Sequence, residues 1–176
     1  MIRKILTVPN PVLTAVCAEV MPNDPQIMGI IQDLTDTLLA QTDPEGVGIA
    51  APQIGKLIRI FIIRTESDKI IPFINPVITN FSKETYFEKV PKDKGILEGC
   101  LSIPQIYGKV TRSYQISVSW TNSDGQSQTQ DFKGLEATYI QHEFDHLNGI
   151  LFTQHCLEEG NPLFRDTKGK FEEIRL

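Results

Sequence analysis

The stretch of residues 114–149 constrains the fold most strongly, because its hydrophobic pattern changes period along the way. Apolar and polar side chains alternate over 114–120, which is typical of a strand with one buried face. The sequence Asn-Ser-Asp-Gly at 122–125 predicts a turn, and a polar strand over 126–132 returns from it. Residues 134–149 then change to helical spacing and end at a glycine. The chain is therefore expected to place an antiparallel strand pair directly before a long helix.

An earlier segment, residues 24–41, predicts an N-terminal helix. Asp24 is a suitable N-cap, and Pro25 suits the first helical position, where its missing N–H does not matter. The helix is expected to pack on the core through an apolar stripe at helical spacing. That stripe consists of Ile27, Ile30, Ile31, Leu34 and Leu38.

Between the two helices the sequence predicts further strands. Residues 58–64 form a short, β-branched apolar run that is typical of a buried strand. Residues 72–79 and 85–90 are two more strand candidates, and Pro72 and Pro76 favour an edge position or a strand end for the first of these. Because helices and strands do not alternate, the order predicts an α+β fold. We expect a mainly antiparallel sheet packed around the motif-bearing helix of the C-terminal half, with one N-terminal helix.

The bulk properties indicate one soluble domain over residues 1–176, which includes a C-terminal tail at 154–176. The net charge of −5 argues against general nucleic-acid binding, which needs surplus Lys and Arg. No apolar run approaches the length of a membrane span. The three cysteines are odd in number and widely spaced, and the N-terminus lacks a signal-peptide pattern, so we expect a reducing cytoplasm.

The second helix carries the chemistry, in the sequence QHEFDHLNG at 141–149. His142 and His146 are four residues apart, so both imidazoles project from one helix face, one turn apart. Glu143 lies beside them without having to bind the ion. This is the HExxH arrangement of two metal ligands and a general base. A surface helix that contains two histidines by chance is the alternative.

A catalytic site of this type needs a third protein ligand and an open position for water. The longer pattern HExxHxxGxxH fails, because Phe152 stands where its third histidine should be. Cys100, in the sequence LEGCLSIP, is a better candidate, although a free cysteine is commonly just a small buried hydrophobe. Four carboxylates remain open as acidic third ligands: Glu158, Glu159, Glu172 and Glu173.

Three segments, taken in order, resemble the signature motifs of peptide deformylase. They are GVGIAAPQ at 46–53, EGCLS at 98–102 and QHEFDHLNG at 141–149. The resemblance covers roughly residues 1–153. It implies an enzyme that hydrolyses the N-formyl group from the N-terminal formylmethionine of newly made polypeptides and releases formate.

The resemblance also implies the roles of individual residues. Cys100, His142 and His146 would bind one divalent metal with water in the fourth position, Fe(II) in the cell and zinc, nickel or cobalt as substitutes. Glu143 would be the general base, and the Gln53 amide and the Leu101 backbone N–H would stabilise the charge that forms on the formyl oxygen. The peptide would bind along a further set of residues, with the last three forming the methionine pocket: Gly46, Gly48, Gly99, Val47, Leu135 and Tyr139.

The implied partners are N-formylmethionyl nascent peptides, bound by a monomer. Tyr107 stands about where several bacterial members carry an arginine near the substrate, so a preference beyond methionine is not implied. The tail mixes four Lys and Arg residues with five acidic ones and lacks the basic helix that some members dock on the ribosome. Any ribosome contact is therefore expected to be transient. No membrane contact and no direct reading of nucleic acid are expected.

Two other classes of protein remain compatible with the sequence. One is an HExxH endopeptidase, which would keep its metal after mutation of Cys100. The other is a binding protein with a closed structural metal site, in which Cys17 or Cys156 is the fourth ligand and Glu143 has no role.

Overall fold

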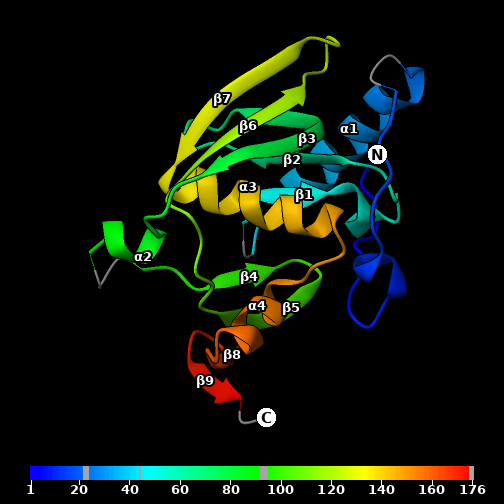
Figure 1. Ribbon diagram of the computed structural model, residues 1–176. Coiled ribbons are helices and arrows are strands. Elements are labelled where there is room, and N and C mark those ends of the chain that lie inside the picture. The colour runs from blue at the N-terminus through cyan, green and yellow to red at the C-terminus, as the bar shows by residue number, and fades with distance from the viewer. Residues whose placement is uncertain (22–23, 44, 92–94, 175–176) are drawn as a thin grey trace.

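The computed structural model describes residues 1–21, 24–43, 45–91 and 95–174, and it has the expected α+β fold (Figure 1). Two antiparallel sheets lie on either side of the long helix α3 (Gly134–Leu147). The larger sheet has the order β1-β2-β3-β6-β7, and the smaller one has the order β4-β5-β8-β9. The strands of the larger sheet are β1 (Gly48–Ala50), β2 (Ile60–Arg64), β3 (Ile70–Phe81), β6 (Gln115–Thr121) and β7 (Ser127–Lys133).

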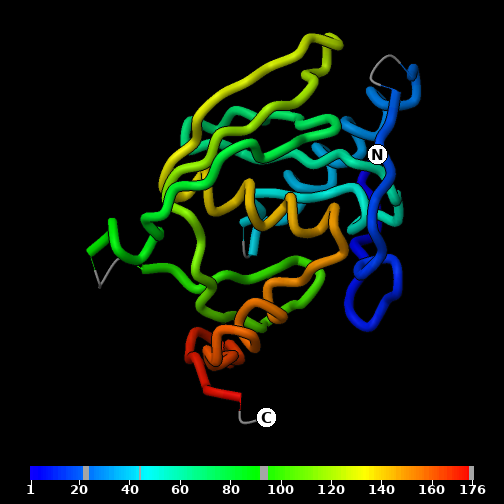
Figure 2. Tube along the Cα trace, in the orientation of Figure 1, coloured from blue at the N-terminus to red at the C-terminus, as the bar shows by residue number. Residues whose placement is uncertain are grey.

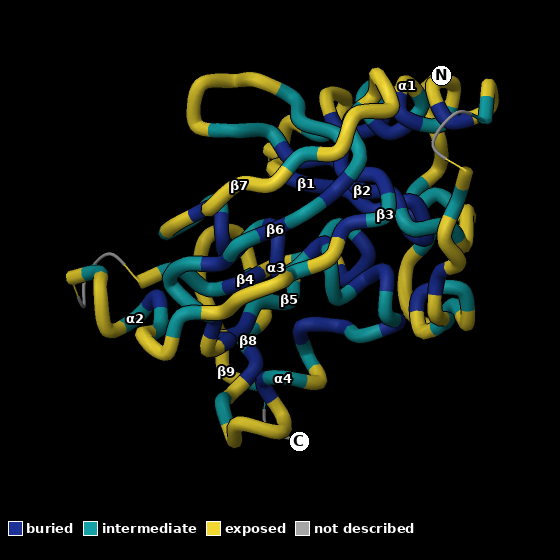
Figure 3. Tube along the Cα trace, turned by 45° about the horizontal axis from the view of Figure 1, so that its top comes forward, coloured by how far each residue is buried: buried dark blue, intermediate teal, exposed yellow. Residues whose placement is uncertain are grey.

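The larger sheet is covered on both faces, which explains the continuous apolar run of β2. Ile60 and Ile62 face the helix α1 (Pro25–Leu39), and Phe61 and Ile63 face α3. All four are fully buried. Successive side chains of a strand point to opposite faces, so a strand between two helices must be apolar at every position. Figure 3 shows this buried band through β1 and β2, whereas β7, at the other edge of the sheet, is more exposed.

The helix α1 begins as expected. Asp24 is its N-cap and accepts a hydrogen bond from the backbone N–H of Gln26 at 2.9 Å, and Pro25 is the first helical residue. Four of the five residues of the predicted stripe are buried, and Ile30 is partly buried.

The expectation that Pro72 and Pro76 favour an edge or a strand end was wrong. Both lie inside β3, the central strand of the larger sheet. The ladder to β6 shifts register between Ile74 and Val77, and Asn75 has a positive φ of 48°. This irregularity lets the strand pass a proline, which has no N–H to give to the ladder.

The strand expected at 85–90 was also wrong, because the short helix α2 (Tyr86–Lys89) occupies this segment. The Glu88 carboxylate accepts hydrogen bonds from the backbone N–H of Thr85 at 2.7 Å and from its hydroxyl at 2.9 Å. Thr-x-x-Glu is a helix-start signal. Here that local signal prevails over the β-branched and aromatic character of the segment.

The strands predicted around the turn at 122–125 are confirmed as β6 and β7, which pair in continuous antiparallel register. In β6 the residues Ile116, Val118 and Trp120 are buried and alternate with partly buried polar residues. Lys133 leads directly into α3, so the sheet and the motif-bearing helix share a junction.

The smaller sheet contains β4 (Glu98–Cys100), β5 (Ile103–Gly108), β8 (Leu163–Asp166) and β9 (Phe171–Ile174). The short helix α4 (Phe152–Glu158) leads from α3 to β8, so the C-terminal tail is folded back onto the sheet that holds Cys100. In Figure 2 the N-terminus lies beside α1 and the C-terminus lies at the opposite end, below this sheet. Two short 3-10 helices, η1 (Pro11–Thr14) and η2 (Ala51–Ile54), complete the fold. None of the described helices is long and apolar enough to cross a membrane.

Candidate metal centre and active site

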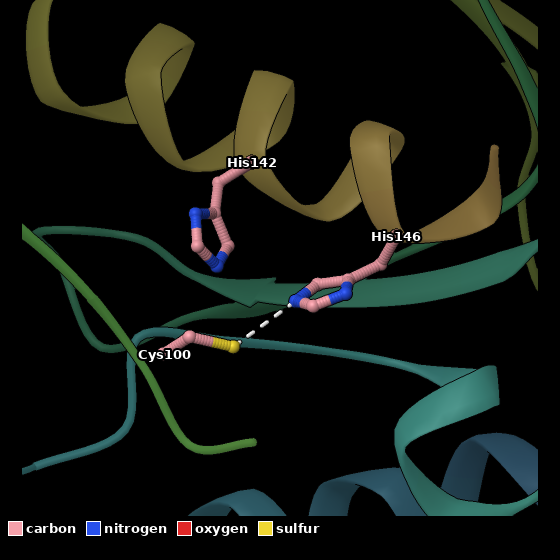
Figure 4. Close-up of side chains that lie close together, drawn as sticks. All are labelled: Cys100, His142 and His146. Atoms are coloured by element: carbon pink, nitrogen blue, oxygen red, sulfur yellow. Dashed lines mark hydrogen bonds between the residues drawn. The ribbon is translucent and has the colours of Figure 1, made fainter. Parts of the chain in front are cut away.

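Two elements that are distant in the sequence bring three metal-binding side chains together. His142 and His146 project from one face of α3, and Cys100 lies at the end of β4 and faces them (Figure 4). Cys100 Sγ lies 3.2 Å from His146 Nε2, and one donor atom from each residue lies within 4.8 Å of the other two. Among the described residues these three are the group that could hold a metal ion. A thiolate and two imidazoles form a donor set suited to Fe(II) or Zn(II).

The orientation of His142 supports this assignment. Its Nδ1 lies 3.0 Å from Oε2 of the buried Glu98, so Nδ1–H donates to the carboxylate and Nε2 keeps its lone pair for the site. A carboxylate on the far nitrogen of a ligand histidine is a recurrent feature of metal sites, because it fixes the ring and makes the nitrogen more basic.

Glu98 is in turn held by a buried ion cluster. Arg112 Nε and Nη2 donate to the two oxygens of Glu98 at 2.8 and 3.0 Å, and its Nη1 donates to Asp145 Oδ2 at 2.6 Å. His155 Nε2 lies 2.9 Å from the same Asp145 oxygen. Burial by itself raises the pKa of Glu98, but the hydrogen bond from His142 and the guanidinium of Arg112 outweigh it and hold the pKa at about 2. The carboxylate is therefore ionised when it orients His142.

The pKa values of Cys100 and His142 are shifted by their burial and by each other's charge. Burial raises the pKa of the Cys100 thiol, but the neighbouring His146 and His142 imidazoles overcome this effect and lower the pKa well below its usual value. Burial also lowers the pKa of His142, and the Cys100 thiolate and Glu98 reverse that effect. The two histidines therefore favour the thiolate form of Cys100, which is the form that binds a metal ion.

Glu143 lies next to the ligands and is 4% exposed. Its Oε2 is buried and has no hydrogen-bond partner among the described residues. Burial raises the pKa of Glu143 to about 7, against the opposing effect of the two histidines. The backbone of β1 passes very close to this carboxylate, since a Cβ built at Gly48 would lie 2.5 Å from Glu143 Oε1.

The side chain of Gln53 lies beside the Cys100 sulfur and is held by hydrogen bonds at both ends of its amide. Its Oε1 accepts a hydrogen bond from the Ala50 backbone N–H at 2.8 Å. Its Nε2 donates to Ser102 Oγ at 3.1 Å and lies 3.6 Å from Cys100 Sγ. The amide nitrogen therefore lies between the Ser102 hydroxyl and the Cys100 sulfur, and Leu101 follows Cys100 directly in the chain.

A cavity of about 880 Å³ opens onto this centre between β1, β4 and α3. It is lined by most of the residues that the sequence singled out: Gly46, Val47, Gly48, Gln53, Gly99, Cys100, Leu101, Tyr139, His142 and Glu143. His146 is buried behind it. Leu135 does not line this cavity. It borders a second cavity of about 160 Å³, together with Gly46, Val47 and Tyr139.

Sequence reasoning missed several residues of the site. Glu98 and Ser102 lie within the EGCLS segment and Asp145 lies within QHEFDHLNG, so their proximity to the candidate ligands was the available signal. Arg112 had no comparable signal, because its contacts with Glu98 and Asp145 depend on the fold.

The alternative ligands do not join the metal-binding group. Cys17 and Cys156, the possible fourth ligands of a structural site, are both buried, in separate core clusters. None of the four open carboxylates belongs to the group either.

Comparisons with known proteins identify the family of the chain. The family model described as polypeptide deformylase matches residues 2–161. The peptide deformylase of Brucella suis biovar 1 (strain 1330) is 37% identical over 159 residues, which cover 88% of this chain and 84% of that protein. The crystal structure of peptide deformylase from Thermotoga maritima has a TM-score of 0.77 and 32% identity, and the match covers 88% of this chain and 97% of that one.

A Met-Ala-Ser-bound crystal structure of the class I type b peptide deformylase from Acinetobacter baumannii is also similar. Its TM-score is 0.75 at 29% identity, and the match covers 88% of this chain and 99% of that chain. The chain therefore belongs to the peptide deformylase family of metal-dependent hydrolases, which remove the formyl group from the N-terminal formylmethionine of newly made polypeptides.

Proposed function

We propose that Cys100, His142 and His146 bind one divalent cation in this enzyme and that Glu143 moves the protons of the reaction. The convergence of the three donor atoms within 4.8 Å carries this proposal. The buried, unpartnered Oε2 of Glu143 beside them supports it, since a polar atom in such a place needs a partner that arrives with the substrate.

The donor set favours a particular class of ion. A thiolate and two imidazoles suit Fe(II), Zn(II), Ni(II) or Co(II) better than Mg(II), which prefers oxygen ligands. We take Fe(II) as the ion used in the cell, with zinc, nickel and cobalt as substitutes. A divalent ion bound there supplies Lewis-acid activation of water at neutral pH.

Glu143 acts as general base and then as general acid. Its Oε2 takes a proton from the attacking water as the new C–O bond forms at the formyl carbon, and it returns that proton to the amine as the C–N bond breaks. Formate and the free amine of methionine are the products. A carboxylate whose pKa burial has raised toward neutrality is suited to both transfers, although a bound cation would lower that pKa.

Gln53 and Leu101 are proposed to stabilise the charge on the formyl oxygen. Gln53 is suited to this role, because its orientation is fixed through Oε1 and its Nε2 remains beside the metal centre. The backbone N–H of Leu101 is the second donor. Removal of one such donor typically costs on the order of 10²–10³ in rate.

The two sheets offer edges for the peptide. Within the described residues β1 pairs only with β2 and β4 pairs only with β5, so each strand has one free edge on the cavity. We propose that the nascent peptide lies between these edges as an added strand beside Gly46, Gly48 and Gly99. The methionine side chain would then point toward α3, into the cavity bordered by Val47, Leu135 and Tyr139.

The remaining proposals concern the molecule as a whole. We propose one folding domain over residues 1–176 that works as a monomer in the cytoplasm. The described part of the tail forms α4, β8 and β9 and contains no basic docking helix, which supports at most a transient ribosome contact. A sedimentation mass of two chains, or more than one unfolding transition, would contradict the monomer or the single domain.

Formate release from formyl-Met-Ala-Ser tests the site. Protein loaded anaerobically with iron or nickel should hydrolyse this peptide. Glu143→Gln should retain the metal and lose about 10²–10⁴ in kcat, the usual contribution of general acid–base catalysis. Glu136→Gln is the matched control on the same helix and should keep full activity. Loss of metal in Cys100→Ala would support the ligand set, and metal retention there would contradict it.

A further inference from the structure

The side of β4 that faces away from α3 has an unusual shape. Glu98 and Cys100 point toward α3, where they meet His142 and His146, so Gly99 between them faces the other way. Tyr107 of β5 lies directly opposite Gly99 in the strand pairing. A Cβ at Gly99 would lie 2.6 Å from the Tyr107 ring, so the ring covers the place where a side chain of β4 would be.

The ring of Tyr107 is held in this place by the C-terminal hairpin of β8 and β9. Phe171 of β9 packs edge-on against Tyr107, with ring centroids 5.2 Å apart and planes at 87°. The strand pairings place Tyr107, Phe164 and Phe171 on the same outer face of the smaller sheet. Phe171 is 52% exposed, so this contact leaves much of its ring open.

This hairpin lies outside the residues that the family model matches. The polypeptide deformylase family model matches residues 2–161, and β8 begins at Leu163. The hairpin nevertheless reaches the active-site cavity, because Asp166 and Lys168 line it together with Tyr107. The C-terminal hairpin therefore contributes to the wall of the substrate cavity.

We propose that Tyr107, with Phe171 as its positioning residue, forms an aromatic ledge that binds the side chain of the second residue of the formylated peptide and favours large apolar residues there. The proposal rests on the proposed placement of the peptide between β1 and β4. In an extended strand successive side chains point to opposite faces. A peptide with its methionine directed toward α3 therefore directs its second side chain outward, beside Gly99 and onto the ring of Tyr107.

The chemistry of the ledge selects apolar side chains over charged ones. Its surface is the ring of Tyr107, which Phe171 supports edge-on, and Gly99 adds no side chain to separate the peptide from that ring. The charged residues at the rim have opposite signs: Asp166 accepts a hydrogen bond from the Gly169 N–H at 2.6 Å, and Lys168 lies two residues further on. Neither sign of charge is therefore favoured over an apolar contact.

The test compares C-terminally amidated peptides of the form formyl-Met-X-Ser, with X as Gly, Leu, Phe, Glu or Lys. Metal-loaded wild type should show kcat/KM about three- to tenfold higher for Phe and Leu than for Gly, the usual range for one aromatic contact. Tyr107→Ala should remove the preference by raising KM for the Phe and Leu peptides while kcat stays unchanged. The reason is that the aromatic contact stabilises the bound substrate and the transition state equally. Phe171→Ala should remove part of it.

Conservative variants and a matched control distinguish loss of the aromatic contact from a general structural effect of the substitution. Tyr107→Phe and Phe171→Tyr should restore the preference. Phe81→Ala removes an aromatic residue that is equally exposed, at 52%, at the end of β3 in the other sheet, and it should change nothing. Peptides of the form formyl-Met-Gly-X should show no dependence on Tyr107, since the third side chain points toward α3.

Two results would overturn the ledge: a preference that survives Tyr107→Ala, or a wild-type preference for Glu or Lys at the second residue. Calorimetric binding of the products Met-Phe-Ser and Met-Gly-Ser gives a second readout that needs no turnover. If metal-loaded wild type fails to hydrolyse formyl-Met-Gly-Ser, the proposed catalytic roles fail, while tighter binding of Met-Phe-Ser that depends on Tyr107 would still support the ledge.

Discussion

At the scale of single residues, the active site depends on how closely a strand backbone approaches a carboxylate. Glu143 is buried, its Oε2 has no partner among the described residues, and its Oε1 lies where the first side-chain atom of residue 48 would be. The position of the Glu143 carboxylate therefore requires a glycine at position 48. The sequence predicted peptide binding at Gly48, and the structure adds the close approach to Glu143.

Gly48→Ala should therefore impair catalysis much more than folding. The added methyl group forces Glu143 away from its position, and we expect kcat to fall by about 10² or more, as for loss of a general base. Overpacking of this kind typically costs about 1–3 kcal/mol of unfolding free energy. Steady-state formate release and urea unfolding measure the two effects. Gly29→Ala on α1, where a Cβ meets nothing within 4 Å, is the control and should keep full activity.

At the scale of secondary-structure elements, hydrophobic period was reliable where it extended over many residues. It predicted α1, β6 and α3, the turn at 122–125 predicted β7, and the continuous apolar run predicted β2. The strand predicted at 72–79 is confirmed as part of β3, with a register shift beside its second proline. The strand predicted at 85–90 was wrong, because a capping interaction starts the helix α2 there. A capping interaction of this kind is local, and Thr85-x-x-Glu88 was present in the sequence as its signal.

The N-cap of α1 provides a test at this scale. Asp24→Ala removes the hydrogen bond to the Gln26 N–H and should lower the free energy of unfolding by about 1 kcal/mol. The activity of the folded enzyme should not change, because α1 covers the face of the larger sheet opposite to α3. Urea unfolding measures the first effect. Gln26→Ala, which leaves that backbone bond in place, should be nearly neutral, and equal losses in both variants would contradict the cap.

At the scale of the whole molecule, the three cysteines lie in three different environments. Cys17 lies in the core between α3 and the larger sheet, and Cys156 lies in the core of the smaller sheet. Burial raises the pKa of both thiols to about 11. Cys100 alone lies in the cavity, and the two histidines lower the pKa of its thiol.

Thiol labelling should therefore depend on the metal. At pH 8 the Cys17 and Cys156 thiols are almost entirely protonated, because that pH lies far below a pKa of about 11. Iodoacetamide should modify Cys100 in metal-free protein and should fail to do so after metal loading. Mass spectrometry of the digested protein identifies the modified residue. Rapid labelling of Cys17 or Cys156 in the native protein would contradict the two buried environments.

The sequence by itself determined a large part of this protein. Helical spacing placed His142 and His146 on one face, and the resemblance of three ordered segments to a known family pointed to Cys100 as the third ligand. Interactions within one helix, and motifs whose residues are neighbours in the chain, need no knowledge of the fold. For this reason the amino-acid sequence alone is sufficient to predict the fold class and the enzyme family.

Only the tertiary structure decided which distant residues support the site. Glu98 meets His142 across 44 positions and Arg112 meets Asp145 across 33, and no local pattern specifies either contact. The same holds for the burial of Cys17 and for the C-terminal hairpin that packs Phe171 on Tyr107. Such contacts depend on how whole sheets and helices pack, because a side chain's partners across an interface are set by the combined shape of both elements.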